Sequence, residues 1–343
     1  MRIKGVTRQW EGGGYYRIRQ PLDELAKHGH QTSCHMAKSD IRAGSADVIV
    51  GQLIGGHGNL ITAVGKVIGG ACTSVEVVHA WWRGLFKDAA LVYELDDDPF
   101  NIEPISPSYA DYAHPVVHDS IKHCLEVSDL VTCSTVPLAE RMSEYNKNVV
   151  VLPNRIDELM LGMERPKRDR LTIGWAGGET HIFDIMSAGY GLKQIMKWHK
   201  DIDVHFIGAD LRPFVKTPRP IRYTPWYIST LEYYKNIDFD IGIAPLVPTV
   251  FAESKSYIKA LEYAALGIPV VASDTRPYRD FVLDGVTGFL VKREHEWARR
   301  LRDLINDEAM RVEMGRKARE VAAGYTIQTG WRDWETAYMS VAK

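Results

Sequence analysis

The stretch at residues 171–181, LTIGWAGGETH, joins a short apolar run to a pair of glycines. β-Branched and aromatic residues in so short a run favour a buried strand, and the glycine pair favours a tight turn into the next element. The amino terminus repeats this order, because the short β-branched run IKGV at residues 3–6 precedes a glycine triplet at residues 12–14. A strand followed by a glycine turn in each half predicts two similar α/β halves.

Short β-branched runs recur along the whole chain, with helical patterns of apolar residues between them. They begin at residues 3, 47, 75, 91, 130 and 149 in the first half and at residues 171, 204, 240 and 268 in the second. This alternation is typical of a parallel, doubly wound sheet. We therefore predict an α/β protein built from two Rossmann-like domains that face each other across a cleft.

The stretch ERPKRDR at residues 164–170 interrupts this pattern with a proline and several charges. Such a break favours a domain boundary. We expect a first domain at residues 1–163, a second at residues 164–324 and a closing helical segment at residues 325–343.

Composition excludes several classes of protein. The chain has 343 residues, of which 45% are hydrophobic, so it can bury two cores. Its net charge is −2 with dispersed basic residues, which argues against a nucleic-acid or anionic-membrane partner but leaves room for a local patch.

An apolar signal core and a run of eighteen apolar residues are both absent from the sequence, so we expect a cytoplasmic protein without stable membrane insertion. The four cysteines have no CxxC spacing, which indicates reduced thiols and no structural metal.

The two glycine turns are the first candidate sites. Glycines such as Gly13 and Gly14, or Gly177 and Gly178, let backbone N–H groups approach a phosphate or a sugar beside a helix amino terminus. A plain flexible loop is the alternative for each turn, since neither is a complete dinucleotide fingerprint. Their equivalent places in both halves favour a ligand beyond the carboxyl ends of the strands.

The segment FAESKSYIKALEYAALGIPVVAS, residues 251–273, is a further candidate. On one continuous helix, Lys255, Lys259 and Glu262 would share a narrow stripe. Two ammonium groups there can neutralise a diphosphate, and the carboxylate can accept hydrogen bonds from ribose hydroxyls. A solvated charged face is the alternative interpretation.

Acidic and imidazole side chains stand at or after the ends of expected strands in both halves. Asp96, Asp97 and Asp98 come directly after the run LVYEL and could bind a metal, orient sugar hydroxyls or cap the next segment. His79 ends the run at residue 75, and His181 follows the second glycine turn, so both could reach the cleft, although a lone histidine is more often structural. GxSxG elbows, P-loops, CxxC pairs and zinc spacings are absent from the sequence.

In this order the motifs resemble the GT-B glycosyltransferases, specifically the large retaining family 4, glycosyl transferases group 1. The second half carries IGWAGGETH, VHFIGAD, the segment at Trp226, DIGIAPL and SKSYIKALEYAALGIPVVAS, similar to the donor-binding domain of that family. The first half carries GGGYYRIRQPLDELAKHGH, YELDDDPFNI, SDLVTCST and VVVLPNRID, similar to the acceptor domain. The closing helix with Trp331 and Trp334 resembles the helix that returns to the first domain.

The resemblance implies roles for particular residues. Glu262 matches the second Glu of the family's Glu-x7-Glu motif and would hold the donor ribose. The first Glu would fall on Ser254, so the adjacent Glu253, or Ser254 with the amides after it, would face the donor sugar. The segment GGETHIFD offers none of the Arg or Lys that family members place after this turn, so Lys255 and Lys259 would bind the diphosphate. The expected donor-binding set is Gly13, Gly14, Gly177, Gly178, His181, Trp226, Lys255, Ser256, Lys259 and Glu262. The expected catalytic set is Asp96, His79, Glu253 and Ser254.

The function implied is transfer of a sugar from a nucleoside-diphosphate sugar, with UDP or GDP, to an acceptor hydroxyl, with retention and without a metal or other cofactor. The alternatives are a non-catalytic nucleotide-sugar or carbohydrate-binding protein, and a sugar-nucleotide epimerase or phosphorylase on the same fold. The acceptor stays open among a glycan, a lipid-linked glycan, a protein, a small molecule and a modified nucleic-acid base, and the sequence is silent on oligomeric state.

Overall fold

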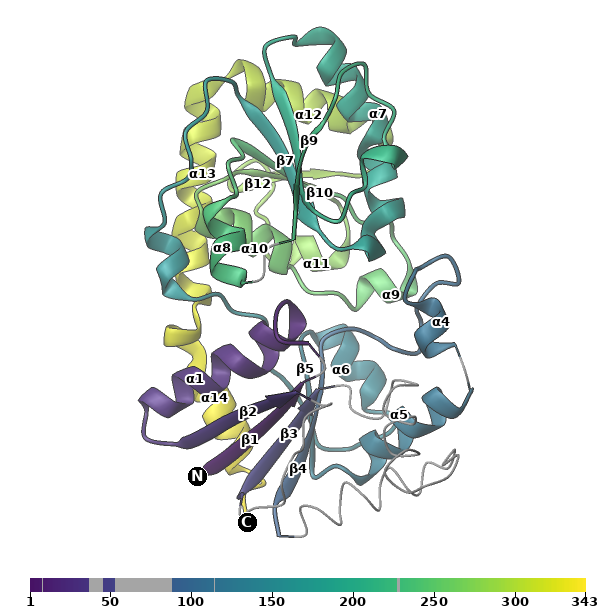
Figure 1. Cartoon of the computed structure of the whole chain (residues 1–343), viewed down its shortest axis with the longest axis vertical. Coiled ribbons are helices and arrows are strands. Elements are labelled where there is room, and N and C mark those ends of the chain that lie inside the picture. The colour runs from purple at the N-terminus through teal and green to yellow at the C-terminus, as the bar shows by residue number, and fades with distance from the viewer. Residues whose placement is uncertain (8, 37–45, 53–87, 114, 227–228) are drawn as a thin grey trace. The chain divides into compact units, whose positions relative to one another are not determined.

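A computed structural model describes residues 1–7, 9–36, 46–52, 88–113, 115–226 and 229–343 (Figure 1). The expected run at residue 75, and with it His79, lies outside these residues. In the described part of the chain, every helix is too short or too polar to cross a bilayer.

The chain divides into two compact units. The first comprises Met1–Asn154, Ser254–Ser256 and Ile327–Lys343, and the second comprises Arg155–Glu253 and Tyr257–Thr326. Residues 155–163 thus group with the second unit, whereas the sequence placed the boundary before Glu164. The closing segment groups with the first unit.

Among its described residues, the first unit contains a six-stranded parallel sheet in the order β2-β1-β3-β4-β5-β6. Its strands are β1 (Arg2–Thr7), β2 (Gln31–Met36), β3 (Val48–Gln52), β4 (Ala90–Leu95), β5 (Leu130–Cys133) and β6 (Val149–Val151). Its helices are a π-helical turn (Tyr15–Arg19), α1 (Gln20–Lys27), α4 (Tyr109–Tyr112), α5 (Pro115–Val127), α6 (Val136–Met142) and α14 (Ile327–Met339).

Helix α14 packs beside α1 and completes the core of the first unit (Figure 1). Trp334 is fully buried against apolar residues of α1 and the sheet. The His28 ring stacks on Trp331 with 3.7 Å between centroids, and His30 Nε2 lies 2.8 Å from the Glu335 carboxylate. The last residues of the chain are therefore part of the first core.

The second unit is also a six-stranded parallel sheet, in the order β12-β11-β10-β7-β8-β9. Its strands are β7 (Thr172–Gly177), β8 (Asp203–Gly208), β9 (Arg222–Pro225), β10 (Ile241–Ala244), β11 (Val270–Ser273) and β12 (Gly288–Val291). Its α-helices are α7 (Ile182–Trp198), α8 (Thr230–Lys235), α9 (Val250–Glu253), α10 (Ile258–Ala265), α11 (Arg276–Arg279), α12 (Glu294–Asn306) and α13 (Glu308–Ala322). Short 3-10 turns are at Glu158–Gly162, Glu179–His181, Arg212–Phe214 and Ala323–Tyr325.

The α/β prediction with two doubly wound sheets is confirmed, because every expected run within the described residues forms a strand at or beside its expected position. The sequence did not predict β2, β9 and β12. All three are edge strands. An edge strand is paired on one side only, so it needs no continuous apolar run, and β2 (QTSCHM) and β9 (RYTP) are mostly polar.

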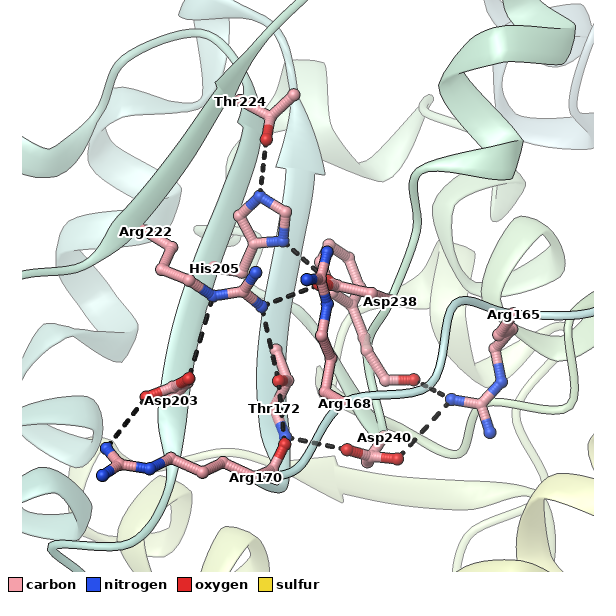
Figure 2. Close-up of polar contacts among 11 residues, drawn as sticks. Arg165, Arg168, Arg170, Thr172, Asp203, His205, Arg222, Thr224, Asp238 and Asp240 are labelled. Carbon is pink, nitrogen blue, oxygen red and sulfur yellow. Dashed lines mark hydrogen bonds and ion pairs between the residues drawn. The ribbon is translucent and has the colours of Figure 1, made fainter.

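Asp238, which precedes β10, ties together segments at the amino-terminal ends of β7, β8 and β9 (Figure 2). Its carboxylate accepts from His205 Nδ1 at 2.6 Å, from Arg168 Nε at 2.7 Å and from Arg222 Nη2 at 2.8 Å. The other ring nitrogen of His205 lies 2.8 Å from Thr224 Oγ1. The basic stretch at residues 164–170, which the sequence marked as a domain boundary, is therefore bound to the base of this sheet.

Candidate functional site

The glycine turn of the second unit lies where β7 ends. A Cβ atom at Gly177 would be 2.9 Å from Lys259 Nζ and 2.6 Å from a ring carbon of Trp175, whereas one at Gly178 would have no neighbour within 4 Å. Lys259 is 8% exposed, and its ammonium donates to the Ala176 carbonyl. The structure thus brings the buried cation of α10 directly against the glycine turn.

Glu262 follows Lys259 by one helical turn on α10 and is only 7% exposed. The hydroxyl of Tyr233 donates to one carboxylate oxygen at 3.1 Å, and that of Tyr234 to the other at 3.4 Å. Burial raises the pKa of the Glu262 carboxyl to about 7, against the opposing effect of Lys259 and the two tyrosines. Lys259 and Glu262 therefore place a buried ammonium and a buried carboxyl one helical turn apart at the carboxyl edge of the sheet.

Trp226 directly follows β9 and is 52% exposed. Its ring centroid lies 5.6 Å from that of Tyr233. A Cβ atom at Gly208 would be 3.0 Å from the indole, and Gly208 has φ +106°, a conformation that favours glycine. The indole is thus seated at the ends of β8 and β9 with half of its surface accessible.

His181 ends the short turn between β7 and α7. Its Nδ1 lies 2.7 Å from Asp184 Oδ2, and Asp184 Oδ1 accepts from the Val247 amide at 2.7 Å. These contacts fix the imidazole beside the first turn of α7.

The expected helical stripe of Lys255, Lys259 and Glu262 is wrong. Helix α9 ends at Glu253 and α10 begins at Ile258, so Lys255 precedes the helix. Serines flank Lys255 on both sides, and serine favours turns and caps because its hydroxyl competes for backbone groups. Lys255 Nζ instead lies 3.2 Å from both carboxylate oxygens of Asp97, within the first compact unit.

The residues around Lys255 differ in exposure. Ser254 is fully buried, and its Oγ has no hydrogen-bond partner among the described residues. The Ser254 carbonyl accepts from Thr135 Oγ1 at 2.7 Å, and Ser256 Oγ accepts from Asn154 Nδ2 at 2.7 Å. Glu253 is half-buried at the end of α9.

In the first unit, the glycine turn packs against Asp96. A Cβ atom at Gly13 would be 2.1 Å from Asp96 Oδ2, and one at Gly14 would be 1.7 Å from the Gln9 carbonyl oxygen. Gln52 Nε2 donates to Asp96 Oδ2 at 3.4 Å. Burial raises the pKa of the Asp96 carboxyl, and the neighbouring Asp97 raises it further.

Beneath this turn lies an ion pair that the sequence analysis missed. Arg17 Nε lies 2.7 Å from Glu94 Oε1, and both side chains are fully buried. Arg17 also donates to the Leu152 carbonyl and to Asn154 Oδ1, while Thr132 donates to Glu94. The available signal was a single carboxylate inside the apolar strand LVYEL, which a buried strand retains only with a partner.

The sequence left metal binding, sugar binding and capping open for Asp96, Asp97 and Asp98. The contacts of Asp98 fit the capping interpretation. Its Oδ1 accepts from the Phe100 amide at 3.0 Å and its Oδ2 from Asn101 Nδ2 at 2.8 Å. Within the described ranges, no group of three or more His, Cys, Asp or Glu side chains is arranged to hold a metal ion.

Two doubly wound parallel sheets in one chain, each with a glycine turn at the carboxyl edge, define the GT-B class of glycosyltransferase fold. Residues 258–321 match the sequence pattern of Glycosyl transferases group 1. The matched stretch begins with α10 and contains both Lys259 and Glu262.

Known glycosyltransferases and related enzymes are similar to this chain in sequence or in fold. The chain is 39% identical over 136 residues to D-inositol 3-phosphate glycosyltransferase of Paenarthrobacter aurescens (strain TC1), and this match covers 39% of the chain and 30% of that relative. Sucrose-phosphate synthase from Thermosynechococcus elongatus superposes with a TM-score of 0.70 at 14% identity, covering 99% of this chain and 98% of that one. Anabaena Alr3699/HepE in complex with UDP-glucose superposes with a TM-score of 0.65 at 11% identity, covering 98% and 99%. At these identities the two structures establish the fold alone.

Proposed function

We propose that the protein transfers a sugar from a nucleoside-diphosphate sugar to an acceptor hydroxyl, with retention and without a metal ion. The observation that carries this proposal is the placement of Lys259 against Gly177 with Glu262 one turn farther along α10. A buried ammonium beside an open backbone turn suits a diphosphate, and a buried carboxylate suits ribose hydroxyls.

The donor lies along the carboxyl edge of the second sheet in this proposal. Its diphosphate contacts Gly177, Gly178 and Lys259, its ribose bonds Glu262, and its base stacks on Trp226. His181 borders the phosphates. The Anabaena neighbour was solved with UDP-glucose, so UDP sugars are the first donors to test, with GDP sugars beside them.

Residues of the 253–256 segment, namely Glu253, Lys255 and Ser256 with the backbone amides that follow Ser254, complete the contacts to the sugar and its leaving phosphate. On the acceptor side, Asp96 and His79 position the attacking hydroxyl beside Gly13 and Gly14. The raised pKa of Asp96 suits a carboxyl that exchanges hydrogen bonds with a neutral hydroxyl.

The chemical step breaks the bond between the anomeric carbon and the β-phosphate oxygen and forms a bond from that carbon to the acceptor oxygen on the same face. The departing phosphate takes the acceptor proton, so the products are a glycoside and a nucleoside diphosphate. Lys259 stabilises the charge that develops on this phosphate, and one preorganised donor of this kind typically contributes about 3 kcal/mol.

A non-catalytic nucleotide-sugar-binding protein is the second candidate. It is favoured by Ser254, because a serine in place of the first Glu of the expected motif supplies no carboxylate for a donor sugar, and this serine is fully buried. Both candidates bind a nucleotide sugar in the cytoplasm, and only the first transfers its sugar.

A thermal-shift and donor-hydrolysis screen over UDP, GDP and ADP sugars tests the proposal. A ligand that binds only the folded state raises the melting temperature, so one nucleotide class should stabilise the wild type and be slowly hydrolysed. Glu262→Ala and Lys259→Ala should lose both responses. Glu232→Ala and Lys235→Ala are matched controls, because this exposed pair on α8 lies outside the donor contacts.

Three other outcomes would change the assignment. Stabilisation without any turnover would favour the binding protein, and conversion of the donor sugar without an acceptor would favour an epimerase. A wild type that responds to no nucleotide sugar would contradict the proposed function.

A further inference from the structure

Helix α7 has one exposed face of mixed apolar and basic character. Met186, Tyr190, Lys193 and Lys197 follow one another at intervals of four, three and four residues, so they form a single stripe along the helix. All four are exposed, and Met186 and Tyr190 are each 46% exposed. The opposite face of α7 packs into the core of the second unit.

Neighbouring segments extend this stripe. Trp198 ends α7, is 53% exposed, and has the Arg302 guanidinium of α12 5.6 Å from its ring centroid. α12 packs against α7 (Figure 1). We call the α7 face the surface formed by Met186, Tyr190, Lys193, Lys197, Trp198 and Phe214.

The loop that carries Phe214 runs alongside the helix. Arg219 donates to the carbonyls of His199 at 2.9 Å and Lys200 at 2.5 Å, which ties the loop to the end of α7. Phe214 is exposed, and a Cβ atom at Gly189 of α7 would be 3.7 Å from Val215. Apolar side chains from two segments therefore share this side of the second unit.

The charge of this region differs in sign from that of the chain. Residues 185–220 contain four lysines and two arginines against three aspartates, a net charge of +3 in a chain of net charge −2. Two of the aspartates are already paired, Asp203 with Arg170 and Asp210 with Arg212. Lys193 and Lys197 form no ion pair within the described part of the chain. Their charge is therefore open to an external anion.

We propose that the α7 face docks the protein peripherally on a bilayer that carries anionic lipid. Aromatic and thioether side chains partition into the boundary between headgroups and acyl chains, while neighbouring lysines attract lipid phosphates. A nucleic-acid duplex would use the lysines but would gain little from exposed Met186 and Phe214 side chains, because its bases are stacked inside the helix and its surface is phosphate and sugar. The apolar residues therefore favour a membrane over a nucleic acid.

Vesicle co-sedimentation tests this proposal with the full chain. We expect binding to phosphatidylcholine vesicles that contain phosphatidylglycerol and little binding to phosphatidylcholine alone. The double variant Lys193→Glu/Lys197→Glu should lose at least about tenfold in partitioning. The variant Met186→Ser/Tyr190→Ser, which leaves the charge unchanged, should also bind more weakly, because the apolar contribution is removed.

Matched controls separate the α7 face from net charge and total apolar surface. Lys147→Glu/Lys317→Glu makes the same charge change elsewhere, and Met310→Ser/Val312→Ser removes exposed apolar groups from α13. Both controls should bind as the wild type does, and thermal melts establish that every variant folds. Equal losses in variants and controls would overturn the proposal. So would equal binding to neutral vesicles, or salt-sensitive binding to duplex DNA without vesicle binding.

Discussion

The hydroxyl of Tyr233 donates a hydrogen bond to the Glu262 carboxylate at 3.1 Å, and Tyr234 donates to the other oxygen of the same group. Neighbouring tyrosines on α8 thus hold the carboxylate of α10 in one orientation. Their hydroxyls stabilise its ionised form, and they act against the burial that raises its pKa to about 7. Other groups that face Glu262 are Lys259, Tyr263 and Tyr278.

Tyr233→Phe should move the pH dependence of donor binding towards higher pH. Loss of one hydrogen bond raises the pKa of Glu262 above about 7, so the carboxylate that bonds the ribose forms only in more alkaline solution. Isothermal titration with the donor nucleotide across neutral pH measures the shift. Tyr190→Phe, on the exposed face of α7, is the control and should leave the profile in place. An unchanged profile in Tyr233→Phe would show that the tyrosine does not tune this carboxyl.

Glu262→Gln should stabilise the unliganded protein in alkaline solution. Because the folded pKa of about 7 lies above the ordinary 4.5, stability is lost as pH rises between these values. The neutral amide avoids this loss, so the gain should approach about 3 kcal/mol above neutrality and vanish in mild acid. Urea unfolding at the two pH extremes measures it. Greater stability of the wild type in alkaline solution would instead indicate that Lys259 compensates the buried charge.

Arg17→Met should destabilise the first unit strongly. Removing one partner of a buried ion pair leaves Glu94 uncompensated, at a typical cost of about 3 to 5 kcal/mol. The free energy of unfolding in urea measures the loss. Arg316→Met serves as control, because Arg316 pairs with Glu313 and Glu320 in an exposed position, and it should have little effect. Similar losses in both variants would contradict a special role for the buried pair.

Asp238→Asn should destabilise the second unit at neutral pH but not in strong acid. Burial works to raise the pKa of Asp238, yet hydrogen bonds from His205 and Arg222 outweigh it and hold the pKa well below the ordinary range. The carboxylate therefore stabilises the fold above about pH 4, and this stabilisation is lost as pH falls. We expect a loss of roughly 3 kcal/mol near neutrality. Asp210→Asn, in an exposed pair with Arg212, should show no comparable loss, and equal effects would refute the prediction.

Gly174→Ala and Gly178→Ala should affect different properties. A Cβ atom at Gly174 would lie 1.8 Å from the Phe239 ring, so this variant should lose about 3 kcal/mol of stability through overpacking. A Cβ atom at Gly178 has open space, so that variant should fold normally and bind the donor diphosphate more weakly. Thermal melts and nucleotide titration distinguish the two. Normal donor binding by Gly178→Ala would remove this turn from the phosphate site.

Local patterns were enough for much of the donor site. The glycine pair after β7 and the spacing of Lys259 and Glu262 on one helix were read from the sequence, and the structure brings these residues together. Lys255 was misplaced because the two serines beside it, which favour a turn, were read as part of one continuous helix, and its contact with Asp97 lies 158 residues away. Tyr233 and Tyr234 lie 29 and 28 residues from Glu262, and no periodicity connects α8 to α10.

By itself, the sequence determined the α/β class, the central strands of both sheets and the glycine turns, because buried strands and tight turns depend on residues close together in the chain. The edge strands β2, β9 and β12, the Arg17–Glu94 pair and the binding of the 164–170 stretch to Asp238 and Asp240 depended on tertiary structure. Each of these features depends on a partner strand or a partner side chain from another part of the sequence, and only folding establishes which partner that is.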